Sequence, residues 1–308
     1  MAISFDTDHN PIVGKAEKLE DDLVVITADN ASPMTFTGTR TYILGTENLI
    51  VIDPGPNSEA HLSSIMKYIG KRKVTDILLT HSHIDHSPLS RQLKTETGAR
   101  IIGFGSADEA RTSFMKKLSS SLDLGGEEGI DKDLVLDKKV VEKQLLKLNN
   151  YNIEVVHTPG HLSNHICFSL KERKTLFSGD HVMGWATTLI SPPDGDLGSF
   201  MNSLEKLSAR KEVIYYPGHG KSLKEPRKMV LAQIKHRRDR EKQILNSVSK
   251  ISRTPAEIVD EVYDDLNPML KAAAIRNVLA HLIDLYERDK VSTDKFSQTA
   301  KFLQSNEN

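Results

Sequence analysis

The sequence predicts an α/β protein in which helices cover sheets, followed by a small helical domain. Three observations lead to this prediction. Short runs of β-branched and aliphatic residues alternate with helical stretches through residue 216, which is the pattern of a layered fold with helices outside and sheets within. Clusters of histidine and aspartate directly follow several of these strand-like runs. After Gly220 the chain becomes strongly basic and its apolar residues recur at helical intervals, which marks a second unit.

The elements follow in order along the chain. Residues 23–27, 41–44 and 49–53 are predicted strands, and residues 58–69 are a predicted helix. Strands and helices then alternate as far as residue 216. The glycine-rich and charged stretch at residues 124–139 is predicted to be an exposed excursion. A chain of 308 residues has room for two domains, or for one large domain with an appendage.

The most informative segment is Thr80-His81-Ser82-His83-Ile84-Asp85-His86, which follows the apolar run 77–79. It places three imidazoles and a carboxylate in an H-x-H-x-D-H pattern. Imidazole nitrogen and carboxylate oxygen suit zinc and similar first-row metals. If a buried strand ends at residue 80, His81 and His83 point the same way by the two-residue alternation, and Asp85 and His86 face a second ion. One metal takes about three protein ligands and keeps a position open for water, so two metals need further donors from elsewhere.

Three later segments repeat the order of strand, turn and candidate ligand. They are Thr158-Pro159-Gly160-His161, Ser178-Gly179-Asp180 and Pro217-Gly218-His219-Gly220, each after an apolar or β-rich run. Glycine next to each candidate ligand lets the backbone bend close to the metals without a Cβ clash. These segments therefore supply the donors that the first motif lacks.

The four motifs together resemble the metallo-β-lactamase superfamily over roughly the first two thirds of the chain. The resemblance implies a four-layer αββα sandwich with the metals at one edge between two sheets. It also implies two zinc ions, or other divalent first-row metals, as cofactors. Carried over residue by residue, it assigns one metal to His81, His83 and His161 and the other to Asp85, His86 and His219, with Asp180 bridging the two.

Three more residues lie beside these motifs. Asp53 closes an apolar run before Pro54-Gly55, and the resemblance makes it a carboxylate that orients the ligands and the histidine loop. A simple turn or N-cap aspartate is the alternative. For His165 and His181, which flank proposed ligands, contact with a ligand or with substrate and a packing or surface role are both open. We assign no metal role to the other histidines, which include His9, His61, His157, His236 and His281.

Composition indicates a soluble enzyme of a reducing compartment. The net charge of −1 argues against a uniformly basic coat for nucleic acid, although a local basic region is compatible with it. Cys167 is the only cysteine, so no intramolecular disulfide is possible, and its apolar setting predicts a buried, inert thiol. No secretory signal is visible, and no apolar run approaches the roughly 20 residues that a membrane helix needs. We therefore expect a cytoplasmic protein without membrane contact.

The region after Gly220 is predicted to contain a linker helix and a small helical module. Residues 221–242 are predicted to form one basic amphipathic helix. Its charged face either contacts nucleic acid or is simply exposed to solvent. Residues 254–257 predict a helix start with a capping box. Residues 254–291 resemble the winged-helix domain of the lactamase-beta-two-like branch of the superfamily. That branch often carries Asn in place of Arg40, so we infer no substrate contact there. We expect a catalytic domain at residues 1–225 and a linker and winged-helix-like domain at residues 226–308.

The expected metals predict the reaction class. Two cations about 3.5–4 Å apart would lower the pKa of a bridging water, deliver hydroxide at neutral pH and stabilise charge on the attacked and leaving oxygens. Asp85 is the expected catalytic residue, because it can orient this hydroxide as well as bind metal. Antibiotic hydrolysis is not expected as the main activity, because class B1 lactamases place cysteine where this chain has Asp180. The interval from Asp180 to His219 is also too short for the inserted domain of the nuclease branch.

Three activities stay open. An endoribonuclease or phosphodiesterase acting on single-stranded RNA is favoured by the lactamase-beta-two resemblance and by the basic helix. Trp185, Tyr215 and Tyr216 are candidate stacking surfaces for such a substrate, although for each aromatic taken singly a core position is the favoured interpretation. A glyoxalase II-like ester or thioester hydrolase shares the metal motifs, but its glutathione-binding segment is not evident. A mononuclear-iron persulfide dioxygenase would use only His81, His161 and Asp180. A metal-stabilised binding module is the non-enzymatic alternative, and the oligomeric state is not predicted.

Overall fold

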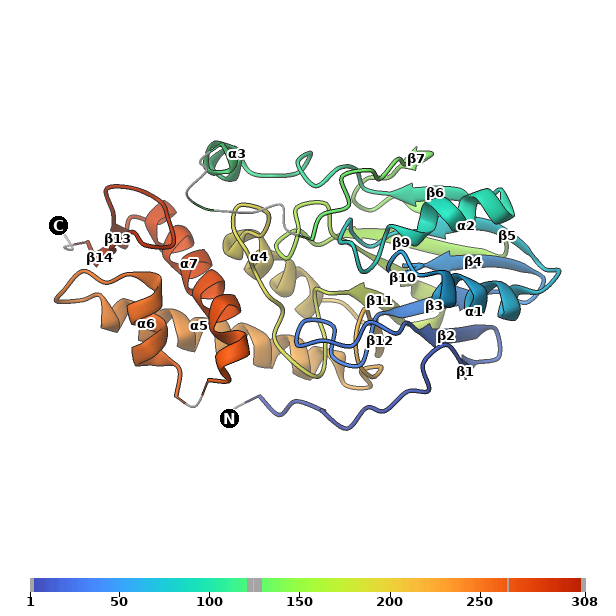
Figure 1. Cartoon of the computed structure of the whole chain (residues 1–308), viewed down its shortest axis with the longest axis horizontal. Coiled ribbons are helices and arrows are strands. Elements are labelled where there is room, and N and C mark those ends of the chain that lie inside the picture. The colour runs from blue at the N-terminus through green and yellow to red at the C-terminus, as the bar shows by residue number, and fades with distance from the viewer. Residues whose placement is uncertain (1–2, 121–123, 125–128, 265, 306–308) are drawn as a thin grey trace.

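The computed structural model describes residues 3–120, 124, 129–264 and 266–305. Two sheets face each other, helices cover their outer faces, and a helical unit lies at the C-terminal end (Figure 1). The predicted four-layer αββα sandwich with a C-terminal domain is confirmed.

The first sheet has seven strands in the spatial order β1 to β7. The pairs from β1 to β4 are antiparallel and the pairs from β4 to β7 are parallel. Helices α1 and α2 cover its outer face, where Ile65 and Leu93 pack against Val51 and Ile77. The elements are β1 Ala16–Glu20, β2 Leu23–Thr27, β3 Arg40–Leu44, β4 Asn48–Ile52, α1 Glu59–Ile69, β5 Lys73–Leu78, α2 Leu89–Thr97, β6 Arg100–Gly103 and β7 Lys138–Lys139. The three predicted strands and the first predicted helix are thus confirmed, with Ser58 as the N-cap of α1.

The second sheet has five strands in the order β12-β11-β10-β9-β8. Its inner face meets the first sheet in a core that includes Phe168 and Phe177, and its outer face carries α4 and the first half of α5. Cys167 lies in this outer core, where burial raises the pKa of its thiol to about 12, as expected for an inert thiol. The elements are β8 Leu145–Leu148, β9 Tyr151–His157, β10 Ile166–Leu170, the short helix Lys171–Arg173, β11 Thr175–Gly179, α4 Leu197–Ser208 and β12 Ile214–Pro217.

The C-terminal unit is built on three helices and a two-stranded hairpin. The elements are α5 Pro226–Ser247, α6 Pro255–Val262, the short helix Pro268–Leu270, α7 Lys271–Glu287, β13 Val291–Ser292 and β14 Leu303–Gln304. Thr254 and Glu257 form the predicted capping box. Helix α3 Ser113–Ser119 packs on this unit although it comes from the catalytic part of the chain. Because Val230 of α5 packs with α4 and Ile244 packs with α7, α5 joins the two units, and the domain boundary at residue 225 stays a prediction.

The prediction of an exposed excursion at residues 124–139 is confirmed for residues 132–133, 135 and 137–139, which are exposed, and is wrong at Leu124 and Asp131, which are buried. Leu124 is fully buried in the core of the C-terminal unit, and β7 extends the first sheet. The carboxylate of buried Asp131 accepts hydrogen bonds from Arg91 and Ser87, which compensate for its loss of water. Residues 125–128 lie outside the described residues. Within the described ranges, each helix is too short or too polar to cross a membrane.

Candidate metal centre

The proposed metal ligands lie at one edge of the sandwich, just beyond the C-terminal ends of four strands. Residues 81–86 follow β5, His161 follows β9, Asp180 follows β11 and His219 follows β12. The structure brings all seven together in two groups, and within each group the possible ligand atoms lie within 4.8 Å of one another. The first group is His81, His83 and His161, and the second is Asp85, His86, Asp180 and His219.

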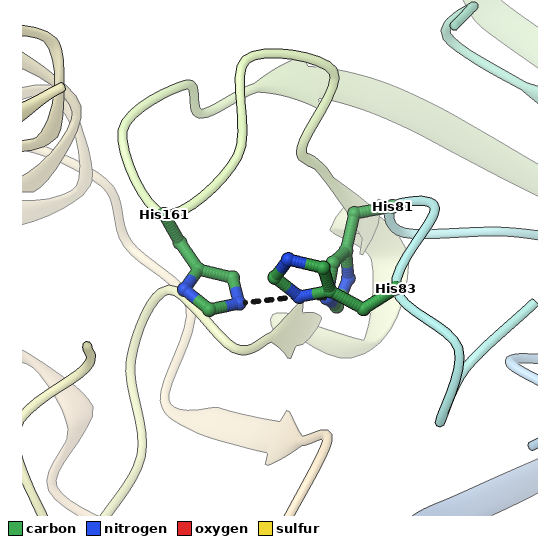
Figure 2. Close-up of side chains that lie close together, drawn as sticks. All are labelled: His81, His83 and His161. Atoms are coloured by element: carbon green, nitrogen blue, oxygen red, sulfur yellow. Dashed lines mark hydrogen bonds between the residues drawn. The ribbon is translucent and has the colours of Figure 1, made fainter. Parts of the chain in front are cut away.

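Three imidazole nitrogens converge in the first group (Figure 2). His83 Nδ1 lies 3.0 Å from His81 Nε2 and 2.9 Å from His161 Nε2. His161 Nδ1 donates to the carbonyl of Leu189 at 2.8 Å, so its Nε2 carries a lone pair when the ring is neutral. Thr80 Oγ1 donates to Asp53 at 2.6 Å and therefore accepts from His81 Nδ1 at 2.9 Å, which leaves a lone pair on His81 Nε2 as well.

Two lone pairs in the first group therefore face a His83 nitrogen that has at most one proton to share. Burial lowers the pKa of His81 well below its usual value, lowers that of His83 to about 3, and also lowers that of His161. Three neutral nitrogen donors converging on one point are the donor set of a divalent metal such as zinc. The group fits a cation better than it fits hydrogen bonding among its own members.

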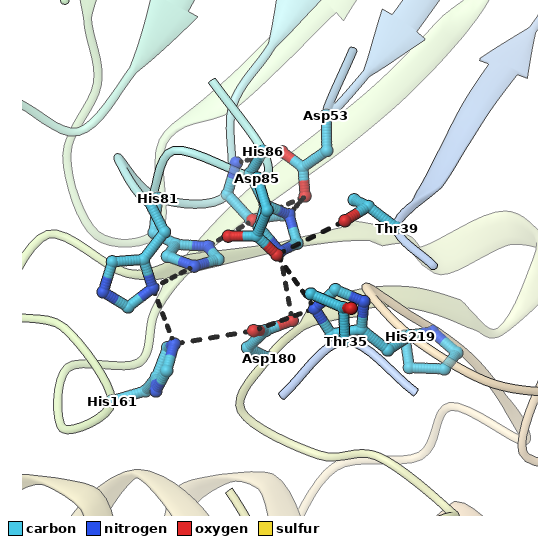
Figure 3. A network of polar contacts seen from close by, with 12 residues as sticks. Thr35, Thr39, Asp53, His81, Asp85, His86, His161, Asp180 and His219 are labelled. Carbon is cyan, nitrogen blue, oxygen red and sulfur yellow. Dashed lines mark hydrogen bonds and ion pairs between the residues drawn. The ribbon is translucent and has the colours of Figure 1, made fainter. Parts of the chain in front are cut away.

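The second group combines two carboxylates with two imidazoles (Figure 3). Asp85 Oδ2 lies 3.2 Å from both His86 Nε2 and His219 Nε2. Asp180 Oδ1 lies 3.4 Å from His86 Nε2, and Asp180 Oδ2 lies 3.4 Å from His219 Nε2. Since Asp180 Oδ2 is also 3.5 Å from His161 Nε2, this carboxylate faces both groups.

The negative charges of Asp85 and Asp180 favour a cation in the second group. Burial on its own lowers the pKa of both imidazoles, but Asp85 and Asp180 outweigh it, raising the pKa of His86 well above its usual value and that of His219 to about 9. His86 Nε2 and Asp180 Oδ1 are buried and have no well-aligned hydrogen-bond partner among the described residues. Buried polar atoms of this kind fit a metal ion that would take the place of the imidazole protons.

Neighbouring groups hold the candidate ligand side chains in place. Asp53 accepts from the backbone N–H of Thr80 at 2.8 Å, and its Oδ2 lies 3.0 Å from His86 Nδ1. Thr39 Oγ1 donates to Asp85 Oδ2 at 3.3 Å (Figure 3). The carbonyl of Gly38 accepts from His219 Nδ1 at 3.3 Å. Partners of this kind orient the ring so that the other nitrogen meets the metal.

Where β12 ends, the backbone has to pass close to the side chains of the second group. A Cβ atom on Gly218 would lie 2.3 Å from Asp180 Oδ1 and 2.6 Å from His86 Cε1, so no side chain fits there. The glycine beside the predicted ligand His219 therefore serves the second group directly.

His165 and His181 differ in what they contact. His165 is buried, and its Nε2 accepts the backbone N–H of Asp180 at 3.2 Å. His181 is buried too, but its ring packs on Phe200 with 4.3 Å between centroids, and its nitrogens have no hydrogen-bond partner among the residues described. His165 thus contacts the backbone of Asp180, whereas His181 packs against Phe200. A surface role is excluded for both.

A cleft of about 680 Å³ opens onto both ligand groups. Met34, Ile84 and Met183 line it on the catalytic side. Its opposite wall comes from α7 of the C-terminal unit, through Ala272 and Ala273. The C-terminal unit therefore shapes the space in front of the candidate metal centre.

The structure weakens the sequence-based arguments for RNA as the substrate. Tyr215 and Tyr216 are 2% and 4% exposed, so both are core residues, as expected for each of them singly, and neither offers a stacking surface. Both faces of the second sheet are covered, and each tyrosine packs into one of the two cores. Trp185 is half-buried and stacks on Phe36. On the basic helix α5, Arg237 is buried, while the charges of Lys228, Lys235 and Arg238 are paired with Glu225, Asp239 and Glu205.

Comparison with known proteins agrees with this geometry. Residues 34–219 match the metallo-beta-lactamase superfamily, and residues 254–297 match the beta-lactamase associated winged helix domain. The beta-lactamase-like protein 2 homolog of Drosophila melanogaster is 32% identical over 297 residues, which cover 92% of this chain and 94% of the relative. An atrochrysone carboxyl ACP thioesterase of Aspergillus fumigatus is 27% identical over 276 residues, covering 83% of this chain and 78% of the relative.

Solved structures show the same fold. A beta-lactamase domain protein from Burkholderia ambifaria matches with a TM-score of 0.79 at 18% identity, covering 97% of this chain and 96% of its own. A metallo-beta-lactamase family protein from Thermus thermophilus matches with a TM-score of 0.76 at 21% identity, covering 93% of this chain and 100% of its own. The chain therefore belongs to the metallo-β-lactamase superfamily of hydrolases and carries the winged helix domain associated with it.

Proposed function

We propose that this chain is a hydrolase that works with two divalent cations, with zinc as the native metal. His81, His83 and His161 would hold one cation, Asp85, His86 and His219 the other, and Asp180 would be shared. One observation carries the proposal: seven side chains from four separate segments meet in two adjoining groups of metal-ligand atoms. Two cations held there would lower the pKa of water and stabilise negative charge on the attacked and leaving oxygens.

Asp85 is the carboxylate that we propose to act on the attacking water. Its side chain is 21% exposed, against 8% for Asp180, and it lines the cleft in front of the ligands. The hydroxyl of Thr39 holds Asp85 Oδ2 in position. A carboxylate that is fixed in this way can orient a water molecule and accept its proton.

The geometry supports an ester or thioester with an apolar acyl part as the substrate. The cleft is walled by apolar side chains on both sides and has a volume typical of a small-molecule site. Arg276 is the only Lys or Arg among its described lining residues, and its guanidinium contacts the backbone carbonyls of Pro192 and Leu124. The thioesterase name of one relative points to the same substrate class.

Single-stranded RNA, which the sequence favoured, has less support. A strand of RNA needs free cations along its path and exposed aromatic rings for stacking. The cleft lining includes none of the residues of α5, the two tyrosines are buried, and several cations of α5 are already paired. RNA therefore enters the test below as the competing substrate.

The proposal is tested by metal analysis combined with a substrate panel. The panel contains S-lactoylglutathione, a fatty acyl thioester, a single-stranded RNA oligomer, a phosphodiester reporter and a cephalosporin, each with metal-replete and chelated protein. We expect two cations per chain, cleavage of at least one thioester, and loss of cleavage in the chelated protein and in His83→Ala. His236→Gln, which changes a half-buried histidine outside the ligand groups, serves as the control.

Other outcomes would correct the proposal at different levels. One iron per chain together with oxygen consumption would indicate a persulfide dioxygenase in place of a hydrolase. Cleavage of RNA alone would keep the two-cation hydrolase and overturn the substrate class. Full activity of His83→Ala would contradict the proposed metal centre itself.

A further inference from the structure

A second cavity, of about 660 Å³, lies apart from the metal cleft, and the two have no lining residue in common. It is formed between the N-terminal segment 9–19, the start of β3 at Arg40, and the segment that follows His219. We call it the Arg40 cavity. The proposed hydrolysis makes no use of it.

Arg40 brings a positive charge into this cavity, and within the described residues Glu17 is the only carboxylate that pairs with it. The residue is 2% exposed. Its Nη1 donates to His9 Nε2 at 2.7 Å, and burial, followed by the charge of Arg40 itself, lowers the pKa of His9 to about 4, so this partner is a neutral acceptor. The carboxylate that approaches it, that of Glu17, is 3.9 Å away and more than half exposed. Arg40 Nε is buried and lacks a hydrogen-bond partner within the described ranges. A buried guanidinium left in this state is costly unless an anion joins it.

Further cations surround the same space. Lys15 and Lys224 line the cavity and are exposed, and neither forms an ion pair within the described part of the chain. Lys221 also lines it and reaches exposed Asp6 and Asp8 only at 3.4–3.5 Å. Pro11 and Ile12 add an apolar wall. Glu17 is the one carboxylate among the described lining residues, against the guanidinium and three ammonium groups. A guanidinium with ammonium groups beside it is an arrangement that recognises carboxylates and phosphates.

We propose that the Arg40 cavity binds a small molecule through an oxyanion, a carboxylate or a phosphate, with Arg40 as its main contact. The apolar wall would cover the organic part of the ligand. The size of the cavity suits a metabolite, since small-molecule sites commonly span about 300–1,000 Å³.

The cavity and the metal centre lie on opposite sides of the same backbone. Thr39 pairs with His219, and its hydroxyl faces Asp85 (Figure 3). The next residue, Arg40, points the other way, as successive residues of a strand do, and its backbone N–H donates to the carbonyl of Gly218 at 2.8 Å. An oxyanion in the cavity would therefore bind outside the cleft, while contacting the segments that carry Thr39 and His219.

Calorimetric titration of the metal-replete protein tests this site, with inorganic phosphate, succinate, AMP and a single-stranded oligonucleotide as probes. The phosphate and succinate arms distinguish the two kinds of oxyanion. We expect Arg40→Gln to weaken binding of the preferred small anion about tenfold or more, because hydrogen bonds to a charged group are lost. The double variant Lys15→Gln, Lys224→Gln changes exposed side chains only, and we expect it to weaken binding about threefold or more, since it removes two charges. Lys116→Gln with Lys117→Gln, an exposed pair on α3, is the matched control and should bind like the wild type.

The variant His83→Ala separates the two sites, since phosphate also binds divalent cations. Binding in the Arg40 cavity should persist in this variant. Loss of all binding in His83→Ala, or equal affinities in the wild type, Arg40→Gln and the Lys15/Lys224 pair, would overturn the proposal. Tighter binding of the oligonucleotide than of AMP through the same lysines would overturn the assignment to a small molecule.

Discussion

The two ligand groups differ in charge although they share one site. The first group contains only imidazoles, whose pKa values burial lowers. The second group contains two carboxylates, which against the effect of burial hold the pKa of His86 and of His219 above the usual range. Without a cation the first group is uncharged, whereas the second keeps protons on its imidazoles. For the two cations that we propose, the histidines of the first group are already neutral, whereas those of the second group would have to release a proton to bind metal.

Removing Asp180 should have the largest effect, because this carboxylate faces both groups. We expect Asp180→Ala to lower kcat/KM more than about a thousandfold, since even groups that only orient ligands contribute about 10–100-fold. Metal content should fall below two per chain. Asp76→Asn is the control, because it changes a buried carboxylate that is paired with Arg100 and lies outside both groups. Near-normal turnover by a folded Asp180→Ala protein would contradict the shared role.

The motif that contains His81 to His86 was predictable because its spacing after a buried strand is local information. The same holds for His161, Asp180 and His219, each of which follows a strand and a glycine turn. The backbone carbonyls of Leu189 and Gly38 were not predictable, since a backbone acceptor leaves no side-chain signature.

Burial on both faces explains why the sequence left two roles open for Tyr215 and Tyr216. Tyr215 and Tyr216 point to opposite faces of β12, and both faces are covered, so period-two alternation could not separate core from surface. Leu124 gave no local signal, because its burial depends on helices from the far end of the chain. Contacts between distant segments therefore set the limit of what the sequence predicted.

Asp53→Asn should lower the metal affinity of the second group more than that of the first. Asp53 contacts His86 directly but reaches His81 only through Thr80. We expect the metal affinity of the second group to fall about 10–100-fold, as for other carboxylates that orient a ligand histidine. Stepwise chelator titration measures both affinities. Asp131→Asn removes a buried carboxylate that contacts Ser87 of the same loop but none of the seven ligands, so it should leave both unchanged. Equal losses in the two groups would show that Asp53 acts on the loop as a whole.

The metal affinities of the two groups should also differ in their dependence on pH. His86 and His219 hold protons at neutral pH in the metal-free protein, and a cation must displace them. The affinity of the second group should rise about tenfold per pH unit for each displaced proton up to about pH 9. The first group should show little change above about pH 6.5, because its imidazoles are already neutral. Chelator competition between about pH 6.5 and pH 9 measures both slopes, and equal slopes would contradict the comparison.

The same shift predicts the sign of a stability change in the metal-free protein. The folded-state pKa of His219 is about 9, above its ordinary value of 6.5. Its contribution to the free energy of unfolding is therefore fully present below about pH 6.5 and is lost as pH rises through about 9. Thermal melts of chelated protein should show this loss, and His219→Gln should reduce it.

The smallest expected effect comes from Asn277 on α7, which ties the C-terminal unit to the first group. Its Oδ1 accepts from the backbone N–H of Ile190 at 3.0 Å, and the neighbouring carbonyl of Leu189 holds His161. Asn277→Ala leaves that N–H without its partner, which should lower the free energy of unfolding by about 1–3 kcal/mol. We expect kcat/KM to fall only a few-fold, with the first group losing more metal affinity than the second, because His161 belongs to the first group. Asn246→Ala, an exposed position on α5, is the control. A lower melting temperature with unchanged metal affinity would mean that the winged helix domain stabilises the fold here without orienting the ligand.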